Sequence, residues 1–371
     1  MNPIELLRKL VAIDSTSTSS NLPMVEALER ETRSLGFETR RLSWVDPAGV
    51  PKANLIAQRG PPGGLALVGH TDCVPFDPAW SGALAGEERE GKLFGRGAAD
   101  TKGFIAAALG AAARSSRPLT LIFTADEEAG CLGARRLVAE AGQGADPALR
   151  PSFAIVGEPT RMTPVLGHKG YCLAEIVVTG AEGHSAYPET GASAIFAAGR
   201  LLRELEQVAS ALQALPDPLF TPPWTTLNVG LIAGGKAKNV IPGSCTLTLE
   251  WRPVPSQDVR RALVLVEEAC ARVSGAGIRV EVRPSRLDAG VAVPRSSPLV
   301  QLLERESGRA AETIPFGTEL PYLTALGADA CVFGPGDIRV AHRTGEFIPL
   351  DELLRAEQIL ARAIERFSPA R

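Results

Sequence analysis

The stretch 121–141, LIFTADEEAGCLGARRLVAEA, contains a strand, a turn and a helix in succession, and it decides the fold class. Leu121 to Thr124 is a short apolar run of the kind that forms a buried strand. Acidic residues follow it directly, and Cys131 to Ala141 then has the apolar spacing of a helix. A buried strand that leads through a charged turn into a helix predicts one strand–helix unit of an α/β domain.

The flanking sequence extends the same pattern in both directions. Leu65 to Val68 and Phe153 to Val156 are further candidates for buried strands, and Asp100 to Arg114 is a candidate helix. This alternation predicts an α/β domain with a largely parallel sheet, in which functional residues gather where the strands end. Polar side chains follow each of the three strands: His70 and Asp72, then Asp126 to Glu128, then Glu158.

A different order begins near Tyr171. The elements expected there are a strand (172–178), a helix (191–207), two strands (225–232 and 245–251), a helix (257–273) and a strand (278–282). This β-α-β-β-α-β order is that of a ferredoxin-like α+β unit. After it, a segment at 297–306, a strand at 330–333 and a helix from Leu350 return to the style of the first domain. We therefore expect two domains: residues 1–170 with 286–371, and an insert at 171–285.

Composition excludes several classes of protein. The 371 residues carry a net charge of −3 without a long run of either sign, so no nucleic-acid surface is expected. The first residues lack the pattern of a signal peptide, and the most apolar stretch, 104–113, is about half the length needed to span a bilayer. The six cysteines are scattered without a CxxC pair, which favours reduced thiols. We expect a cytoplasmic protein with neither a nucleic-acid nor a membrane partner.

Two of the four histidines occur among carboxylates. His70 lies in VGHTD and His342 in RVAHRTGE. The carboxylates are Asp100, Glu127, Glu128 and Glu158. Imidazoles combined with carboxylates suit zinc, whereas calcium and magnesium prefer oxygen ligands alone. Taken singly, each residue has an ordinary alternative, such as a hydrogen-bonded loop histidine or a solvated helix start. Their positions directly after buried strands favour a metal site.

Spacing assigns candidate roles around that site. Asp72 lies two residues after His70, on the same side of an extended chain, so its carboxylate is expected to accept the second imidazole N–H. Glu127 and Glu128 are neighbours on opposite sides of the chain, so one can bind metal while the other faces the substrate. A metal that lowers the pKa of water, with a carboxylate to take the proton, is what a metallohydrolase needs.

Seven motifs in order give the chain a family resemblance. They are HTDCVPF, GRGAADTKG, TADEEAG, VGEPT, GHKGY, GHSAYP and AHRTGE. Together they resemble the di-zinc aminoacylase and carboxypeptidase superfamily, from about residue 3 to the C-terminus. The resemblance implies a zinc-peptidase-like catalytic domain, an inserted dimerisation (lid) domain, a homodimer, and two zinc ions per subunit with cobalt as a possible substitute.

The resemblance also implies roles for individual residues. One zinc would be bound by His70, Asp100 and Glu158, and the other by Asp100, Glu128 and His342, with Asp100 bridging. Glu127 would be the general base, Asp72 would orient His70, and the peptide bond Asp100–Thr101 would be cis. In the insert, His184 would reach the partner subunit's active site and hold the developing oxyanion. Lys169, Asn239 and Arg252 match positions that bind the substrate carboxylate, and Gly336 lies near the segment that closes the pocket.

Two further segments narrow the expected substrate. FTPPWTTLNVGLIAGGKAKNVIP with EWRPVP, and GTELP ahead of FGPGDIRVAH, resemble the branch that deacetylates N2-acetyl-L-ornithine. Glu319 would then pair with the side-chain ammonium of the substrate, because a buried charge needs a partner. The alternative is a helix start, with Thr318 as N-cap and Glu319 in the first turn. Other candidate reactions are succinyl-diaminopimelate desuccinylation, N-acetylcitrulline or N-acetyl-lysine deacylation, and dipeptide cleavage by a carboxypeptidase.

The sequence gives less support to functions of other classes. Gly95-x-Gly97 resembles part of a dinucleotide fingerprint, but Asp100 occupies the third glycine position and would repel a pyrophosphate. Gly230 to Lys236 has the spacing of a phosphate-binding loop, yet Ala237 replaces the hydroxyl that would bind magnesium. A metal-free binding protein on the same scaffold would lack ligands or the base, and here every such position is filled. Zinc content after purification separates that reading from an enzyme.

Overall fold

The computed structural model describes residues 1–142 and 146–369, which form two compact units. Unit 1 comprises Met1–Gly167, Val293–Glu312 and Thr318–Arg371, and unit 2 comprises His168–Ala292 and Thr313–Gly317. The chain re-enters unit 1 after Ala292, later than residue 286, where the sequence pattern places the boundary. The reason is that the strand Arg279–Asp288 of unit 2 extends beyond residue 286 and stays paired with its neighbour over that length.

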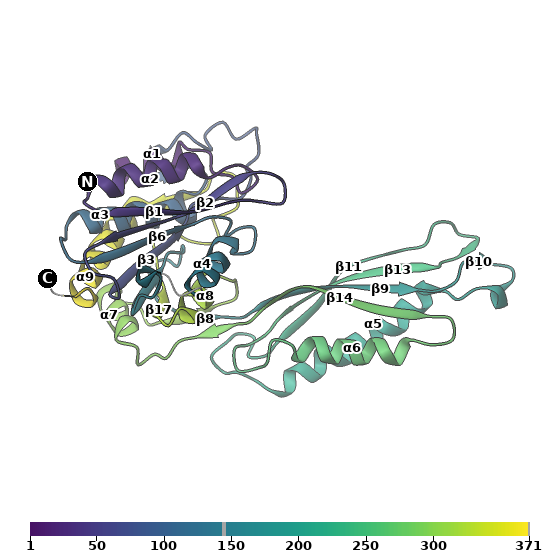
Figure 1. Ribbon diagram of the computed structural model, residues 1–371. Coiled ribbons are helices and arrows are strands. Elements are labelled where there is room, and N and C mark those ends of the chain that lie inside the picture. Colours follow the sequence, from purple (N-terminus) through teal and green to yellow (C-terminus); the bar gives the residue numbers. More distant parts are fainter. Residues whose placement is uncertain (143–145, 370–371) are drawn as a thin grey trace. The chain divides into compact units, whose positions relative to one another are not determined.

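Unit 1 is an α/β domain (Figure 1). Its helices are α1 (Pro3–Val11), α2 (Leu22–Ser34), α3 (Gly103–Ala113), α4 (Leu132–Gly142), α7 (Pro298–Ser307), α8 (Leu320–Ala325) and α9 (Leu350–Phe367), with short turns η1 (Ala98–Lys102) and η2 (Pro147–Leu149). Its strands are β1 (Glu38–Val45), β2 (Pro51–Arg59), β3 (Leu65–His70), β4 (Glu87–Arg89), β5 (Lys92–Phe94), β6 (Leu119–Thr124), β7 (Phe153–Val156), β8 (Val165–His168), β17 (Asp329–Val332) and β18 (Phe347–Pro349). The short strand β16 (Glu312–Ile314) begins in unit 1 and ends in unit 2.

The large sheet of unit 1 is mixed. Its strands follow the order β1-β2-β6-β3-β7-β17-β8. The central ladders, β6 with β3, β3 with β7 and β7 with β17, are parallel, whereas β1 with β2, β2 with β6 and β17 with β8 are antiparallel. The expected largely parallel sheet is therefore found at the centre and not at the margins. The central strands are buried along almost their whole length, as their unbroken apolar runs predict.

Helix α3 occupies the middle of the helical layer that covers this sheet. It packs against α1, α9 and β3, and its sequence GFIAAALGAAA has no polar side chain. A helix that is apolar on every side belongs inside the domain, where it meets protein all round. The outer helix α9 is amphipathic instead, with Leu353, Leu360 and Ile364 buried and most of its charged residues, Glu357 excepted, on the outer side. No helix in the described part of the chain has the length and apolar character that a membrane crossing requires.

The sheet brings three sequence-distant segments to one edge. β3, β6 and β7 run parallel, so their carboxyl ends, with the residues that follow them, lie side by side. Gly157 shows how tightly this edge is built, because a Cβ atom there would come within 2.1 Å of the Phe104 ring. Only glycine fits between β7 and α3, so Glu158 follows a strand that lies directly on the helix.

Unit 2 is a ferredoxin-like α+β fold, as the order of its elements predicts. Its elements are β9 (Tyr171–Thr179), β10 (Gly183–His184), η3 (Pro188–Thr190), α5 (Ala194–Ala211), η4 (Leu212–Ala214), β11 (Thr226–Gly234), β12 (Val240–Ile241), β13 (Ser244–Arg252), α6 (Arg261–Val273), β14 (Arg279–Asp288) and β15 (Val291–Ala292). The main sheet has the antiparallel order β11-β13-β9-β14, and α5 and α6 pack together beside it (Figure 1). Unit 2 has its own core around Trp251, Leu247 and Leu201.

Candidate metal centre

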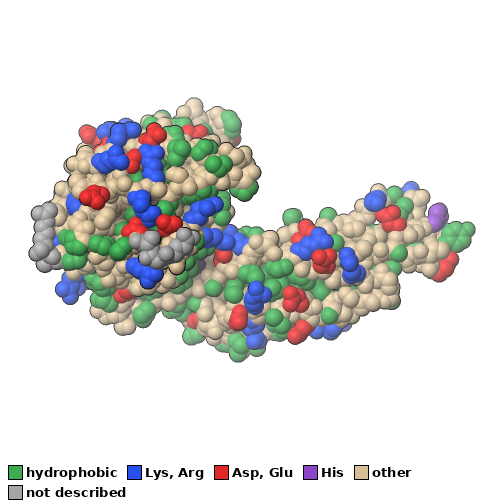
Figure 2. Space-filling model, viewed as in Figure 1, with side chains coloured by type: hydrophobic (Ala, Val, Ile, Leu, Met, Phe, Trp, Pro, Cys, Tyr) green, Lys and Arg blue, Asp and Glu red, His purple; other side chains and the backbone are tan. Residues whose placement is uncertain are grey.

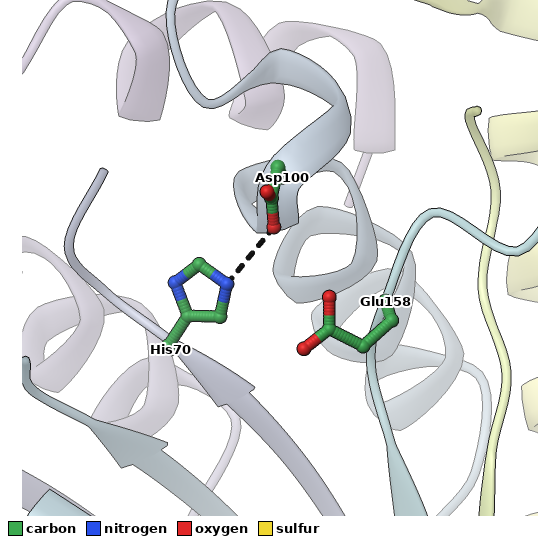
Figure 3. A group of neighbouring side chains, drawn as sticks. All are labelled: His70, Asp100 and Glu158. Carbon is green, nitrogen blue, oxygen red and sulfur yellow. Dashed lines mark hydrogen bonds and ion pairs between the residues drawn. The ribbon is translucent and has the colours of Figure 1, made fainter. Parts of the chain in front are cut away.

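Three side chains converge at the carboxyl edge of the central strands (Figure 3). His70 ends β3, Asp100 lies in η1 and Glu158 follows β7. Each offers a ligand atom, and these atoms lie within 4.8 Å of one another. The Nε2 atom of His70 is 3.0 Å from Oδ1 of Asp100. All three residues are buried, so the cluster is shielded from bulk water.

A second cluster shares Asp100 with the first. Glu128 and His342 complete it, again with ligand atoms within 4.8 Å of one another. The Nε2 atom of His342 lies 3.2 Å from Oδ2 of Asp100 and 2.9 Å from Oε1 of Glu128. Asp100 therefore directs one carboxylate oxygen toward each histidine, which is the geometry of a bridging ligand. The Asp100–Thr101 peptide is cis, as the family resemblance implies.

Asp72 holds this site together in a different way from the one expected. Its carboxylate was expected to accept the second N–H of His70, but the Nδ1 atom of His70 is 2.9 Å from the main-chain carbonyl of Asp72 and 3.8 Å from the carboxylate. The carboxylate accepts the backbone N–H groups of Glu127 and Glu128, at 3.0 and 3.2 Å. Asp72 thus fixes the imidazole through its carbonyl and the acidic turn through its side chain.

A buried ion pair supports the same turn from the other side. Lys52 donates to the carboxylate of Asp126 at 2.6 Å and to the carbonyl of Ser17 at 2.6 Å. Asp126 has φ of 55°, a left-handed conformation that is uncommon outside glycine. A charge buried without a partner is costly, so the pair fixes Asp126 in this conformation. Glu127 therefore projects from a turn that is anchored by the residue on each side of it.

Glu127 lies beside both clusters but belongs to neither. Burial is the main cause that raises the pKa of its carboxyl to about 8; the neighbouring carboxylates of Glu128, Glu319 and Asp100 contribute to this rise, and His70 opposes it. Burial would also raise the pKa of Asp100, but hydrogen bonds from His342 and His70 outweigh it and hold that pKa below its usual range.

The acidic side chains around Asp100 lie so close together that they indicate whether the site can hold metal cations. Burial raises the pKa of Glu158 well above its usual value, and the negative charges of Asp100 and Glu127 add to the effect. Buried carboxylates that raise one another's pKa are stabilised by nearby positive charge. Two imidazoles and three carboxylates form the mixed nitrogen and oxygen donor set that zinc accepts. The residues present therefore fit two divalent cations that share Asp100.

Glu319 lies in the same region, and the Thr318 part of the helix-start alternative agrees with the structure. Helix α8 begins at Leu320, whose N–H is bound by the Thr318 hydroxyl, and Glu319 makes no capping bond with its side chain. Its Oε2 atom accepts the hydroxyl of Thr124 at the end of β6, at 2.9 Å. Its Oε1 atom is buried and has no hydrogen-bond partner among the described residues. Burial raises the pKa of this carboxyl to about 7.

The remaining predicted residues are divided between the units. In unit 2, His184 is exposed in β10 and Asn239 is exposed before β12, while Lys169 is buried and donates to the carbonyl of Trp224 at 2.6 Å. Arg252 stacks on the Tyr171 ring, 4.7 Å from its centroid.

Gly336 belongs to unit 1. It has φ of 93°, and its N–H donates to Glu352 at 2.8 Å. The left-handed conformation explains why glycine occupies this turn.

Comparison with known proteins identifies the family. The model of peptidase family M20/M25/M40 matches residues 66–366, which is most of the chain. The chain belongs to this family.

Curated relatives of this M20 protein match it over almost its whole length. It is 50% identical to an acetylornithine deacetylase from Myxococcus xanthus, over 98% of this chain and 97% of that one. It is 35% identical to an acetylornithine deacetylase from Proteus mirabilis (strain HI4320), over 98% and 96% of the two chains.

Solved structures share the fold at lower identity. A tripeptidase from Staphylococcus aureus superposes with a TM-score of 0.77 at 20% identity, covering 98% of each chain. A dinuclear metal-binding peptidase of the M20 family from Bacillus subtilis gives a TM-score of 0.70 at 17% identity, covering 98% of this chain and 96% of that one. Both span the two units, so the architecture is that of the M20 fold.

Sequence reasoning missed the residues that support the M20 site from behind. Lys52 bonds to Asp126 in the turn before Glu127, and Glu346 accepts the backbone N–H of Asp100. Arg96 in turn donates to Glu346, and Thr124 donates to Glu319. Arg96 and Glu346 lie inside the motifs GRGAADTKG and AHRTGE, so their closeness to Asp100 and His342 in sequence was an available signal. Lys52 lies far from any motif, and only its unusual place in the apolar strand 51–59 marked it.

Proposed function

We propose that this chain hydrolyses the amide bond of N2-acetyl-L-ornithine and releases L-ornithine and acetate. The observation that carries hydrolysis is the pair of donor clusters that share Asp100, with the carboxylate of Glu127 beside them and outside both. The names of the relatives, at up to 50% identity over nearly the full length, support acetylornithine as the substrate. Production of ornithine would give the chain a role in arginine biosynthesis.

Zinc is the proposed metal, with cobalt as a possible substitute. His70, Asp100 and Glu158 would hold one ion, and Asp100, Glu128 and His342 the other. Ions bound there supply a water of lowered pKa and a Lewis acid for the amide carbonyl. The protein contributes the orientation of its ligands, which the carbonyl of Asp72 and the turn of Glu127 and Glu128 maintain.

The proposed role of Glu127 is proton transfer. Its carboxylate accepts a proton from the attacking water and later gives that proton to the amide nitrogen, so that the C–N bond breaks with a neutral amine as leaving group. The same group acts first as base and then as acid, and no other proton carrier is needed. Its place on a turn held by Asp72 and Asp126 keeps the carboxylate in position between the two steps.

Unit 2 is proposed to bind the substrate carboxylate and to form the dimer. Lys169, Asn239 and Arg252 are the candidate carboxylate ligands. Strand β11 is an edge strand with exposed apolar side chains, of which Leu231 is 69% exposed, and Phe196 on α5 is 76% exposed. Figure 2 shows hydrophobic side chains on the surface of this unit. An open, apolar sheet edge favours pairing with a second copy. His184 of one subunit would then hold the oxyanion in the site of the other.

Mixed dimers test the shared site. Glu127→Gln and His184→Ala subunits are each expected to be nearly inactive. When they exchange, random pairing gives half heterodimers with one complete site of two, so about a quarter of wild-type activity should return. A mixture of Glu127→Gln with Glu128→Gln is the matched control and should show no recovery, because both changes lie in unit 1. Absence of recovery in the first mixture, with exchange demonstrated, would contradict a role for His184 across the dimer.

A substrate panel tests the proposed reaction. We expect kcat/KM for acetylornithine to exceed that for acetylcitrulline, acetyl-lysine and succinyl-diaminopimelate, each measured with zinc-loaded enzyme. A preference of about 10²-fold over the neutral citrulline derivative corresponds to about 2.7 kcal/mol. A higher kcat/KM for succinyl-diaminopimelate, or for a dipeptide, would contradict acetylornithine as the substrate and indicate that reaction instead. It would not affect the proposed metal chemistry.

A cytoplasmic location is part of the same proposal. All six cysteines are free thiols and buried, which fits a reducing compartment.

A further inference from the structure

A buried ion pair lies directly behind Asp100 and is not part of either donor cluster. The Nη1 atom of Arg96 donates to Oε2 of Glu346 at 2.7 Å, and the two side chains are only 3% and 1% exposed. Few arginine–glutamate pairs are buried so completely, because removing both charges from water is costly unless they are well bonded. The pair therefore has a role other than that of a surface ion pair.

The second oxygen of Glu346 binds the backbone that carries Asp100. Its Oε1 atom accepts the N–H of Ala99 at 3.0 Å and the N–H of Asp100 at 3.2 Å. Two amides on one charged oxygen fix the start of η1 in orientation as well as in position. The side chain of Asp100 then points toward His70 and His342.

The pair also joins the two loops that hold opposite sides of the site. Strand β5 pairs with β18, which places the loop after β5 beside the segment just before β18. Glu346 belongs to the second of these segments, four residues after His342, and its carbonyl accepts the N–H of Gly95 in the first. One carboxylate thus ties the loop of His342 to the loop of Asp100.

Arg96 is itself held in place from several sides. Its guanidinium lies 5.4 Å from the Trp80 ring and donates to the carbonyl of Pro75 at 3.4 Å. Its backbone N–H donates to the carbonyl of Ala83 at 2.7 Å. A guanidinium fixed in this manner balances the charge of Glu346 without leaving that carboxylate free to turn toward a cation.

We propose that Glu346, held by Arg96, is a positioning residue for Asp100: it fixes the backbone of the shared candidate ligand so that one carboxylate oxygen faces His70 and the other faces His342. The inference rests on the proposed metal centre and assigns that centre a supporting pair. Glu346 acts through the main chain and does not bind metal or substrate. Because Asp100 is common to both clusters, loss of Glu346 weakens the binding of both ions.

The test compares zinc affinity in Glu346→Gln and wild-type protein by competition with a chromophoric chelator. The variant amide keeps the shape of the side chain but loses the charge and presents an N–H₂ group to Arg96. We expect zinc affinity to fall about 10–100-fold, as for other residues that orient metal ligands. In zinc-saturated protein, kcat should fall while KM for acetylornithine stays within twofold.

Glu357→Gln is the matched control. Glu357 is also a buried glutamate paired with an arginine, Arg114, at 3.2 Å, and it lies on α9 away from both clusters. The zinc affinity and the kcat of the Glu357→Gln variant should stay within twofold of the wild-type values. Equal losses in the two variants would overturn the proposal, since they would reflect a general loss of stability. Zinc affinity within twofold of wild type in Glu346→Gln would overturn it as well.

Two milder changes decide the matter if Glu346→Gln does not fold. Arg96→Lys keeps the charge and loses the fork, and Arg96→Met loses both. We expect the methionine variant to lose at least ten times more zinc affinity than the lysine variant, and equal losses would overturn the proposal. Failure of wild-type protein to bind two zinc ions per subunit would instead count against the metal centre itself, so the two failures are distinguishable.

Discussion

Replacing Glu127 by glutamine should lower kcat for acetylornithine by about 10²–10⁴-fold, the range that a positioned general base supplies. Glutamine has the same shape but cannot take a proton from water at neutral pH. Glu127 is outside both donor clusters, so the variant should keep two zinc ions per subunit. The measurements are steady-state kinetics and zinc content on the same preparation.

The adjacent residue gives the control for this prediction. Glu128→Gln changes the same chemical group one position along the same turn, but Glu128 belongs to the cluster with Asp100 and His342. That variant should lose zinc as well as activity. Zinc lost from Glu127→Gln, or a kcat within tenfold of wild type, would show that the base is another residue.

Replacing Glu319 by glutamine should lower kcat/KM for acetylornithine by about 10²–10⁴-fold, since breaking a buried ion pair costs about 3–5 kcal/mol. The unpartnered Oε1 atom of this buried carboxylate is the position at which a substrate ammonium would bind. Such a cation would favour the ionised carboxylate against the burial that raises its pKa to about 7. The kcat/KM for acetylcitrulline, whose side chain is neutral, should fall less than tenfold in the same variant.

Thr124→Val is the matched control for the substrate comparison. It removes the hydroxyl that donates to Glu319 and leaves the charge in place. A misplaced carboxylate should impair both substrates to a similar and smaller extent. If Glu319→Gln itself impaired acetylornithine and acetylcitrulline equally, Glu319 would have a structural role, and substrate choice would have to rest on other residues.

The case of Glu319 shows why local sequence could not settle its role. A threonine followed by a glutamate before an apolar run fits the start of a helix, and α8 does begin there. The direction of the side chain depends on Thr124, which is distant in sequence and lies at the end of a central strand. Only the packing of α8 against the sheet brings the two together.

Asp72 shows a similar limit at shorter range. The spacing from His70 correctly predicted that the two residues lie close together. The two-residue repeat of an extended chain does not predict whether the carbonyl or the carboxylate of Asp72 contacts the imidazole. The carboxylate is drawn instead to two backbone N–H groups in the turn after β6. A charged acceptor with two amide donors is the more favourable arrangement.

The sequence by itself determined the α/β class, the ferredoxin-like insert and the positions of polar residues after buried strands. Apolar runs and helical periodicity are local properties that follow from which faces must avoid water. Only the tertiary structure decided that the margins of the sheet are antiparallel, that the Asp72 carboxylate binds the acidic turn, and that Arg96 and Glu346 hold the backbone of Asp100. Those features depend on contacts between segments as far apart as residues 96 and 346, and they form only when the chain closes around its core.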